Sequence, residues 1–249
     1  MTGKLIVFEG GEGCGKTTQI QRLYGWLQNH KILQLLRTQN KVVGIKLTRE
    51  PGGTAVGQKI RHLLLNQTDP ESPPILSKTE LLLYAADRAQ HVEEMLRPWL
   101  AAGYWVLCDR YTDSTVAYQG NGRQLDIDMI DRLNQIATGG LKSDLTLWLN
   151  ASPDVGLARM RERGEADRIE QASRDFHQRV AAGFAVLSED GGRSHLLREG
   201  ASAAVSASEL NFMSSGATVE FDGEQSVEAV ATTIQMVVER CLERWYPSV

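Results

Sequence analysis

The chain has 249 residues, of which 42% are hydrophobic and 23% are charged, and its net charge is −4. This composition is ordinary for a globular protein, and the length allows one large domain or two small ones with a sizeable core. The weak negative charge leaves room for local basic clusters, but it gives no whole-chain indication of a nucleic-acid or anionic-membrane partner.

Cysteine usage and hydropathy bear on the compartment. The three cysteines are widely spaced and form no Cys-x-x-Cys pair. This spacing argues against a disulfide framework or a zinc site and fits a reducing compartment. No apolar stretch reaches the ~18 residues of a membrane span, and the first apolar run ends at Glu9, too early for a signal peptide. We therefore expect a cytoplasmic protein that binds neither membrane nor nucleic acid.

Apolar runs of strand length alternate with longer helical patterns along the chain. Strands are predicted at 5–8, 42–47, 105–108, 145–149 and 218–221. Helices are predicted at 16–36, 54–66, 78–102, 126–138, 153–163, 171–188 and 226–244. This alternation predicts an α/β fold with a parallel sheet covered on both faces. Ligands in such folds bind beyond the carboxyl ends of the strands.

Two segments interrupt the alternation. Residues 30–41 mix polar and apolar side chains, and they either extend the first helix or loop out before the second strand. Residues 190–216 are rich in Ser, Ala and Gly, which is typical of a long surface loop. Both segments are predicted to be surface insertions in a single domain that spans residues 1–249.

A phosphate-binding loop follows the first predicted strand in the sequence FEGGEGCGKTT. Gly10, Gly15, Lys16 and Thr17 fit the pattern G-x-x-x-x-G-K-[ST], with the strand before it and the helix after it that the P-loop requires. Backbone N–H groups of such a loop surround phosphate oxygens, the lysine reaches the β- and γ-phosphates, and the threonine hydroxyl binds Mg²⁺. The predicted ATP-binding residues are Gly10, Gly11, Gly13, Cys14, Gly15, Lys16, Thr17 and Thr18.

Charged residues stand at the ends of the next two strands. Arg49 ends the second strand in LTREPGGT, and Asp109 and Arg110 end the third in WVLCDRYTDSTVAYQG. Two arginines at neighbouring strand ends can bind one phosphate, and an acid beside them can organise Mg²⁺ and its waters. Each arginine taken singly could instead form a surface salt bridge. The chain lacks the N-K-x-D motif by which GTPases read their base.

Five stretches in order, FEGGEGCGKTT, TREPGGT, LLYAADRAQH, DRYTDSTVAYQG and RGEADRIE, resemble bacterial thymidylate kinases (dTMP kinases). The resemblance runs from the N-terminus to about residue 182 and resumes near residue 220. It implies transfer of the γ-phosphoryl group of MgATP to dTMP, giving dTDP and ADP for dTTP synthesis. It also implies a P-loop NTPase-type three-layer fold, with five parallel strands, helices on both faces and a small lid, and a homodimer.

The resemblance assigns roles to individual residues. Arg49 and Arg110 correspond to the arginines that hold the dTMP phosphate, Asp109 to the acid that organises metal and phosphate, and Arg88 to the arginine that hydrogen-bonds thymine. Tyr84 stands where the family usually has a phenylalanine stacked on the base. Tyr118 corresponds to the tyrosine that crowds the 2′ position and disfavours ribonucleotides. For both tyrosines, ordinary core packing is the alternative. Glu12 contacts either the sugar 3′-OH or a metal-bound water. The predicted substrate-binding residues are Glu12, Arg49, Tyr84, Arg88, Arg110, Ser114, Tyr118 and Gln119, and the predicted metal-binding residues are Thr17 and Asp109.

The catalytic arginine is expected in the lid, at about residues 159–170. One branch of the family carries this arginine in the P-loop after the acid, but here Gly13 follows Glu12. The segment from 159 to 170 resembles the lid of the bacterial branch. Arg163 is the first candidate, with Arg159 and Arg161 as alternatives, although a solvated helix face would look similar. The predicted catalytic groups are Lys16, Arg163, Asp109 and Glu12.

Two alternatives remain open at this stage, and the first is another nucleoside monophosphate kinase or a deoxynucleoside kinase. A deoxynucleoside kinase needs a carboxylate base for a neutral hydroxyl, and Glu9 or Glu50 would serve. The paired Arg49 and Arg110 argue against it, since they would have no phosphate to hold. A catalytically silent nucleotide-binding protein is the second alternative, and the intact Lys16 argues against that.

Overall fold

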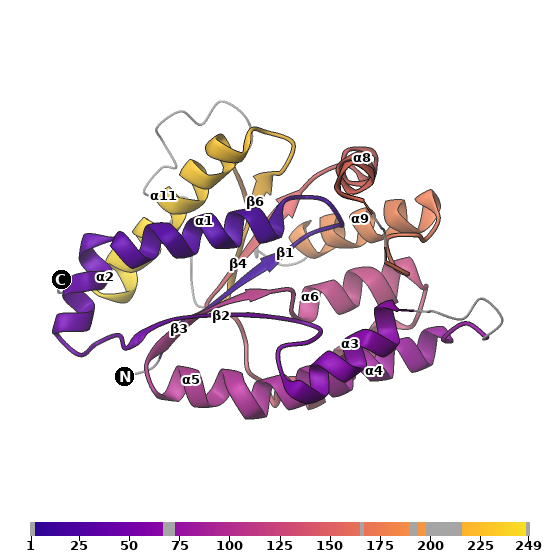
Figure 1. Ribbon diagram of the computed structural model, residues 1–249, viewed down its shortest axis with the longest axis horizontal. Helices are drawn as coiled ribbons and strands as arrows, with labels where there is room; N and C mark the ends of the chain where they lie inside the picture. The colour runs from indigo at the N-terminus through magenta and orange to yellow at the C-terminus, as the bar shows by residue number, and fades with distance from the viewer. Residues whose placement is uncertain (1–2, 67–72, 165–166, 190–193, 198–215, 248–249) are drawn as a thin grey trace.

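The computed structural model describes residues 3–66, 73–164, 167–189, 194–197 and 216–247. A parallel sheet with the strand order β2-β3-β1-β4-β6-β5 lies at its centre (Figure 1). The strands are β1 (Leu5–Glu9), β2 (Gly44–Arg49), β3 (Tyr104–Asp109), β4 (Leu145–Asn150), β5 (Ser194–Leu197) and β6 (Ala217–Asp222). The predicted α/β class and all five predicted strands are confirmed. The short edge strand β5 is additional, and it lies in the predicted insertion 190–216, most of which falls outside the described residues.

The helical segments follow the predicted order. They are α1 (Lys16–Asn29), α2 (Lys31–Thr38), α3 (Ala55–Leu65), α4 (Ser77–His91), η1 (Val92–Leu96), α5 (Arg97–Ala101), α6 (Thr112–Thr115), η2 (Val116–Gly122), α7 (Ile127–Thr138), α8 (Pro153–Arg163), α9 (Arg174–Glu189) and α11 (Val227–Trp245). Thr54, Asp126, Ser152 and Ser226 each accept a hydrogen bond from the backbone N–H three residues later. These caps satisfy N–H groups that have no partner inside the helix, and they set where the helices begin.

The two faces of the sheet carry separate cores. Ile6 and Phe8 of β1 point toward α1, α2 and α11, whereas Leu5 and Val7 point toward η1. Figure 1 shows α1 and α11 on one side of the strands and α5 on the other. All five residues of β1 are buried, as a central parallel strand requires. Within the described ranges, no helix combines the length and apolar character needed to cross a membrane.

Residues 30–41 neither extend the first helix without a break nor form a loop, so both expectations for their secondary structure were wrong. The predicted helix 16–36 breaks at His30, whose backbone is extended (φ −74°, ψ 127°), and α2 begins at the next residue. Leu33 and Leu36 of α2 are fully buried in the core beneath α1 and α11. Because its apolar side chains recur at a spacing of three, α2 is amphipathic and packs one face into the core.

Two other helical segments differ from prediction. The predicted helix 78–102 contains a π-helical turn, η1, where the N–H of Arg97 bonds to the carbonyl of Val92. The next residue is Pro98, which has no N–H to donate to the preceding turn, and the wider turn accommodates it. Residues 112–122 were given no element but form α6 and η2. Their threonines and glycines are poor helix formers, and packing against α9 overrides that preference.

Candidate active site

A cavity of about 710 Å³ opens beyond the carboxyl ends of the strands. The P-loop, the segment after β2, the start of α6, the side of α4 and the turn at residues 167–170 surround it. The predicted site residues that line it are Glu12, Gly13, Cys14, Gly15, Lys16, Thr17, Thr18, Arg49, Tyr84, Arg88, Asp109, Arg110, Ser114, Tyr118 and Gln119. Gly10 and Gly11 belong to the same loop without lining the cavity. The side chain of Arg163 lies outside the described part of the chain.

The P-loop curls around the Lys16 side chain. Its Nζ donates to the carbonyl oxygens of Gly10 at 3.0 Å and Gly11 at 2.7 Å. Gly13 has a φ of +68°, and a Cβ there would lie 2.2 Å from the carbonyl oxygen of Gly156 in α8. Position 13 therefore tolerates no side chain, which accounts for the absence of an arginine after Glu12.

Arg110 leaves β3 in a strained conformation and turns back over the P-loop. Its φ is +71°, an uncommon value for a residue with a side chain. The guanidinium donates to the carbonyl of Gly10 at 2.9 Å and to Glu12 at 2.7 Å. The neighbouring turn is held by Glu9, which accepts from the backbone N–H of Tyr111 at 2.7 Å and from the hydroxyl of Ser114. The strain is thus held by buried contacts, as is common at functional sites.

Glu12 is ionised and held in place. Burial acts to raise its pKa, but the charges of Arg110 and Lys16 and a hydrogen bond from Tyr118 outweigh burial and lower the pKa to about 2. The Tyr118 hydroxyl donates to Glu12 at 2.9 Å. Tyr118 therefore does more than pack in the core, because its polar end faces the cavity beside the P-loop acid.

Glu9 behaves in the opposite way. Burial and the nearby charge of Asp113 raise the pKa of Glu9 to about 7. Its carboxyl group does not line the cavity, and it acts on the site through the Tyr111 and Ser114 contacts.

Asp109 and Thr17 have the chemistry of a magnesium site. Register pairs Asp109 with Arg49 across β2 and β3, and the Arg49 guanidinium lies 3.9 Å from its carboxylate. The other carboxylate oxygen, Oδ1, is buried and has no hydrogen-bond partner in the described structure. The Thr17 side chain is exposed in the same cavity. A carboxylate and a hydroxyl are the oxygen ligands that Mg²⁺ accepts beside nucleotide phosphates, so these residues fit the ion.

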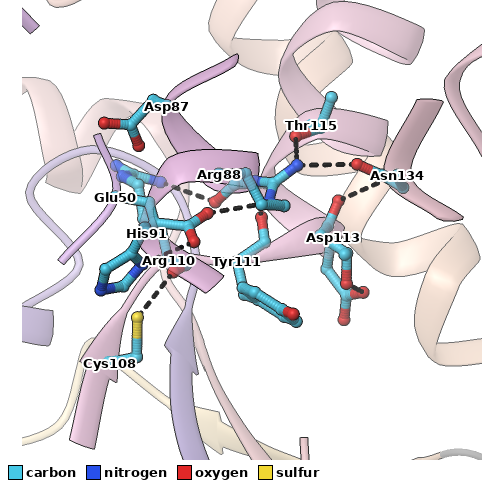
Figure 2. A network of polar contacts seen from close by, with 12 residues as sticks. Glu50, Asp87, Arg88, His91, Cys108, Arg110, Tyr111, Asp113, Thr115 and Asn134 are labelled. Carbon is cyan, nitrogen blue, oxygen red and sulfur yellow. Dashed lines mark hydrogen bonds and ion pairs between the residues drawn. The ribbon is translucent and has the colours of Figure 1, made fainter. Parts of the chain in front are cut away.

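The Arg88 guanidinium uses most of its N–H groups in hydrogen bonds within the protein. Its Nε donates to Glu50 at 2.8 Å, Nη1 donates to Thr115 and Asn134 at 2.7 Å each, and Nη2 donates to the carbonyl of Tyr111 at 2.7 Å. Figure 2 shows these bonds converging on the guanidinium. Of the five N–H groups of an arginine, one remains for a ligand. The predicted contact with a base is therefore limited to a single hydrogen bond from Nη2.

Glu50 anchors this arrangement from the segment after β2. One carboxylate oxygen accepts from Arg88, and the other lies 2.9 Å from Nδ1 of His91, whose Nε2 is 2.7 Å from the hydroxyl of Thr48. Asp87 accepts from the backbone N–H of Gly52 at 2.9 Å. Consecutive turns of α4 thus tie down the segment that carries Arg49.

The lid arginines have different surroundings. Arg159 lines the cavity, and its Nη1 donates to the carbonyl of Gly223 at 2.8 Å. Arg161 is exposed and does not line the cavity. Arg168 forms an ion pair with Glu80 of α4. Among the lid arginines with described side chains, only Arg159 reaches the cavity.

Sequence reasoning missed several residues of the site. Arg61 lines the cavity from α3 and donates to the carbonyl of Pro51 at 3.1 Å, and burial followed by the charge of Arg49 lowers its pKa. The signal was present, since Arg61 is one of the few cations that follow TREPGGT on the same helix. Thr115 and Asn134 gave no such signal, because single polar residues on helices are common.

Proteins of similar sequence identify the family of the chain. The family model described as thymidylate kinase matches residues 8–203. The chain belongs to the thymidylate kinase family. A thymidylate kinase from a Cyanothece species is 50% identical over 258 aligned residues, covering 100% of this chain and 99% of that protein. One from Trichormus variabilis is 48% identical, covering 98% of this chain and all of the relative. One from Acaryochloris marina is 46% identical, covering 99% and 100%.

Membership confirms the resemblance seen in the five motifs. A thymidylate kinase phosphorylates dTMP to dTDP with ATP as the donor, and this is the activity of the chain. It is a nucleoside monophosphate kinase, and the prediction of that enzyme class is confirmed.

Proposed function

We propose that the kinase brings dTMP and MgATP together in the 710 Å³ cavity, with the P-loop holding the donor and the α4 and η2 side holding the acceptor. The observation that carries this assignment is the meeting of Lys16, Arg49 and Arg110 around one cavity. The acceptor is an anionic phosphate oxygen, so the reaction needs positioning and charge neutralisation more than a strong base.

Each predicted residue has a role in this proposal. Lys16 neutralises charge on the β- and γ-phosphates, and Arg49 and Arg110 hold the dTMP phosphate. Arg88 gives its free Nη2 N–H to the thymine ring. Glu12, which Arg110 and Tyr118 hold in place, contacts either the sugar 3′-OH of dTMP or a metal-bound water.

The remaining substrate contacts complete the pocket. Tyr84 stacks on the base, and Ser114 and Gln119 border it. Tyr118 crowds the 2′ position. Arg163 supplies the catalytic charge from the lid, with Arg159 as the alternative.

A magnesium ion completes the proposal. Asp109 and Thr17 would hold it, and a bound Mg²⁺ neutralises charge on the phosphate oxygens. We further infer that the kinase is a single cytoplasmic domain that forms a homodimer, and that it binds neither nucleic acid nor membrane. A role in dTTP synthesis follows from the product dTDP.

The deoxynucleoside kinase alternative loses support from the two acids it needs. Glu50 is 4% exposed, and its two oxygens each accept a hydrogen bond, one from Arg88 and one from His91. These bonds fix it as the anchor of Arg88, which argues against a role as the base for a substrate hydroxyl. Glu9 is 1% exposed and does not line the cavity.

The test is ADP production by the purified protein with MgATP and each of dTMP, dUMP, dCMP, dGMP, AMP and UMP. Strong turnover with dTMP, weaker turnover with dUMP and loss of activity in Arg163→Ala are expected. Equal activity of Arg163→Ala and wild type, with a large loss in Arg159→Met, would move the catalytic role to Arg159. Turnover with another monophosphate in place of dTMP would contradict the roles of Tyr84, Arg88 and Tyr118, and no dTMP-dependent ADP would refute the proposal.

A further inference from the structure

Glu80 of α4 is a fully buried carboxylate outside the cavity. Its Oε1 accepts from Gln119 Nε2 at 3.0 Å and from Arg123 Nε at 3.0 Å. Its Oε2 accepts from Arg123 Nη2 at 3.0 Å and from Arg168 Nη2. A carboxylate has about four acceptor positions, so the capacity of Glu80 is filled. One charge therefore holds three side chains from different parts of the chain.

Two of the three partners belong to the boundary of the cavity. Gln119 of η2 lines it directly. Arg168 lies in the turn at 167–170, whose other members Asp167, Ile169 and Glu170 all line the cavity. Arg123 also binds Glu80, but it does not line the cavity, and its guanidinium lies over the Phe176 ring. Glu80 thus links two surfaces of the cavity that are separated by 49 positions in sequence, from 119 to 168.

The turn that carries Arg168 is compact. The Asp167 carboxylate accepts from the backbone N–H groups of Ile169 at 2.9 Å and Glu170 at 3.0 Å. Arg168 joins this turn to the end of α3 through its Nε, which donates to the carbonyl of Leu64 at 2.6 Å. Its only described ion pair is with Glu80. The Arg168 backbone N–H also donates to the carbonyl of Leu65 at 3.2 Å, and Ile169 is buried in the core. The ion pair with Glu80 is therefore the anchor that joins the turn to α4, and it adds to these contacts with α3 and the core.

The same carboxylate decides how the Gln119 amide is oriented. A carboxylate only accepts hydrogen bonds, so the amide nitrogen of Gln119 must face Glu80. The amide oxygen is then left for another donor. If Glu80 lost its charge, the amide could turn over and offer N–H groups in place of an oxygen.

We propose that Glu80 is a positioning residue of the kinase, which fixes the turn at 167–170 through Arg168 and orients the amide of Gln119. This inference deepens the proposed function, on which its kinetic consequences rest. Glu80 itself touches neither substrate nor reacting atoms. It acts on the base side of the cavity through Gln119 and on the lid side through Arg168.

The kinetic test compares Glu80→Gln, Arg168→Met and Arg123→Met. Glu80→Gln is expected to raise the KM for dTMP about tenfold and to lower kcat about tenfold, since a misplaced charged hydrogen bond costs on the order of a factor of ten. Arg168→Met should lower kcat about tenfold with KM for dTMP within about twofold of wild type, because Gln119 keeps its partner. Arg168→Lys, which keeps one donor, should recover part of kcat.

Arg123→Met is the matched control, because it removes an ion pair from the same carboxylate without touching the cavity. Because Gln119 and Arg168 keep their bonds to Glu80, it should leave kcat and both KM values within about twofold of wild type. Its cost should appear instead in the free energy of unfolding, since the carboxylate that loses a partner is buried. Equal losses in Arg123→Met and Arg168→Met, or a normal KM for dTMP in Glu80→Gln, would overturn the positioning role. If Glu80→Gln does not fold, the contrast between the two arginine variants still decides the matter.

A second readout does not depend on the substrate. Amide hydrogen exchange at residues 167–170 should be faster in Glu80→Gln and Arg168→Met than in wild type, and unchanged in Arg123→Met. Unchanged exchange in all three variants would overturn the inference. Faster exchange without any dTMP turnover in the wild type would instead refute the proposed function and leave the role of Glu80 in placing the turn intact.

Discussion

The two sides of the cavity are built in different ways. On the side of α4 and η2, polar groups are buried and bonded to one another, as in the four hydrogen bonds of Arg88 and the four of Glu80. On the P-loop side, the exposed hydroxyls of Thr17 and Thr18 have no side-chain hydrogen bond in the described structure. The fold therefore organises the first side by its own contacts, whereas the second side offers groups that are free for phosphate and metal.

The largest effect should come from the P-loop side. Lys16→Ala removes the cation that we propose neutralises the transferring phosphate, and we expect dTMP-dependent ADP release to fall about 10³-fold. Thermal unfolding should change little, because the lysine bonds only to carbonyl oxygens of its own loop and to Cys14. A loss of less than tenfold in steady-state assays would contradict the role of Lys16.

The α4 side should respond through stability. Arg88→Met leaves the buried Glu50 without its arginine, and breaking a buried pair in this way should lower the free energy of unfolding by about 3–5 kcal/mol. Urea unfolding of Arg88→Met and wild type measures this difference in free energy. Arg22→Met is the control, because its pair with Glu228 is exposed and is worth at most about 1 kcal/mol. Similar losses in both variants would mean that the two pairs do not differ as described.

Glu9, at the end of β1, should make the stability of the protein depend on pH. Its pKa of about 7 in the folded state exceeds the ordinary value of 4.5, so the folded state keeps a proton that the unfolded state loses. Stability from this group is complete below about pH 4.5 and is lost as pH rises through about 7. Between pH 5 and 8, wild type should lose about 2–3 kcal/mol relative to Glu9→Gln in urea unfolding. Parallel pH profiles of the two proteins would contradict this shift.

The smallest expected effect separates two arginines of the lid. Arg159→Met should lower kcat about tenfold, because Arg159 lines the cavity, while Arg161→Met should stay within about twofold. Steady-state assays with dTMP compare them directly. A larger loss in Arg161→Met than in Arg159→Met would show that the exposed arginine approaches the substrates.

The sequence predicted those parts of the site whose chemistry is local. The P-loop, the arginines at the strand ends and the order of strands and helices follow from short motifs and periodicity. Glu80 could not be found this way, because its partners are 39, 43 and 88 positions away and an acid on a helix is usually solvated. The prediction for residues 30–41 failed for a related reason. The spacing of Leu33 and Leu36 does not say whether their side chains reach the core, and only the tertiary structure, in which α2 packs beside α1, supplies that answer.

The contact between Gly13 and Gly156 has a consequence for evolution and for protein engineering. A kinase with the arginine in the P-loop needs a side chain at position 13, but here the α8 backbone fills that space. A single substitution at Gly13 would force the loop and helix apart before it could contribute a charge. Moving the catalytic arginine from lid to loop therefore requires at least two coordinated changes, one in the loop and one in α8. In this chain, a substitution at position 13 alone is therefore expected to disturb the P-loop without supplying a usable charge.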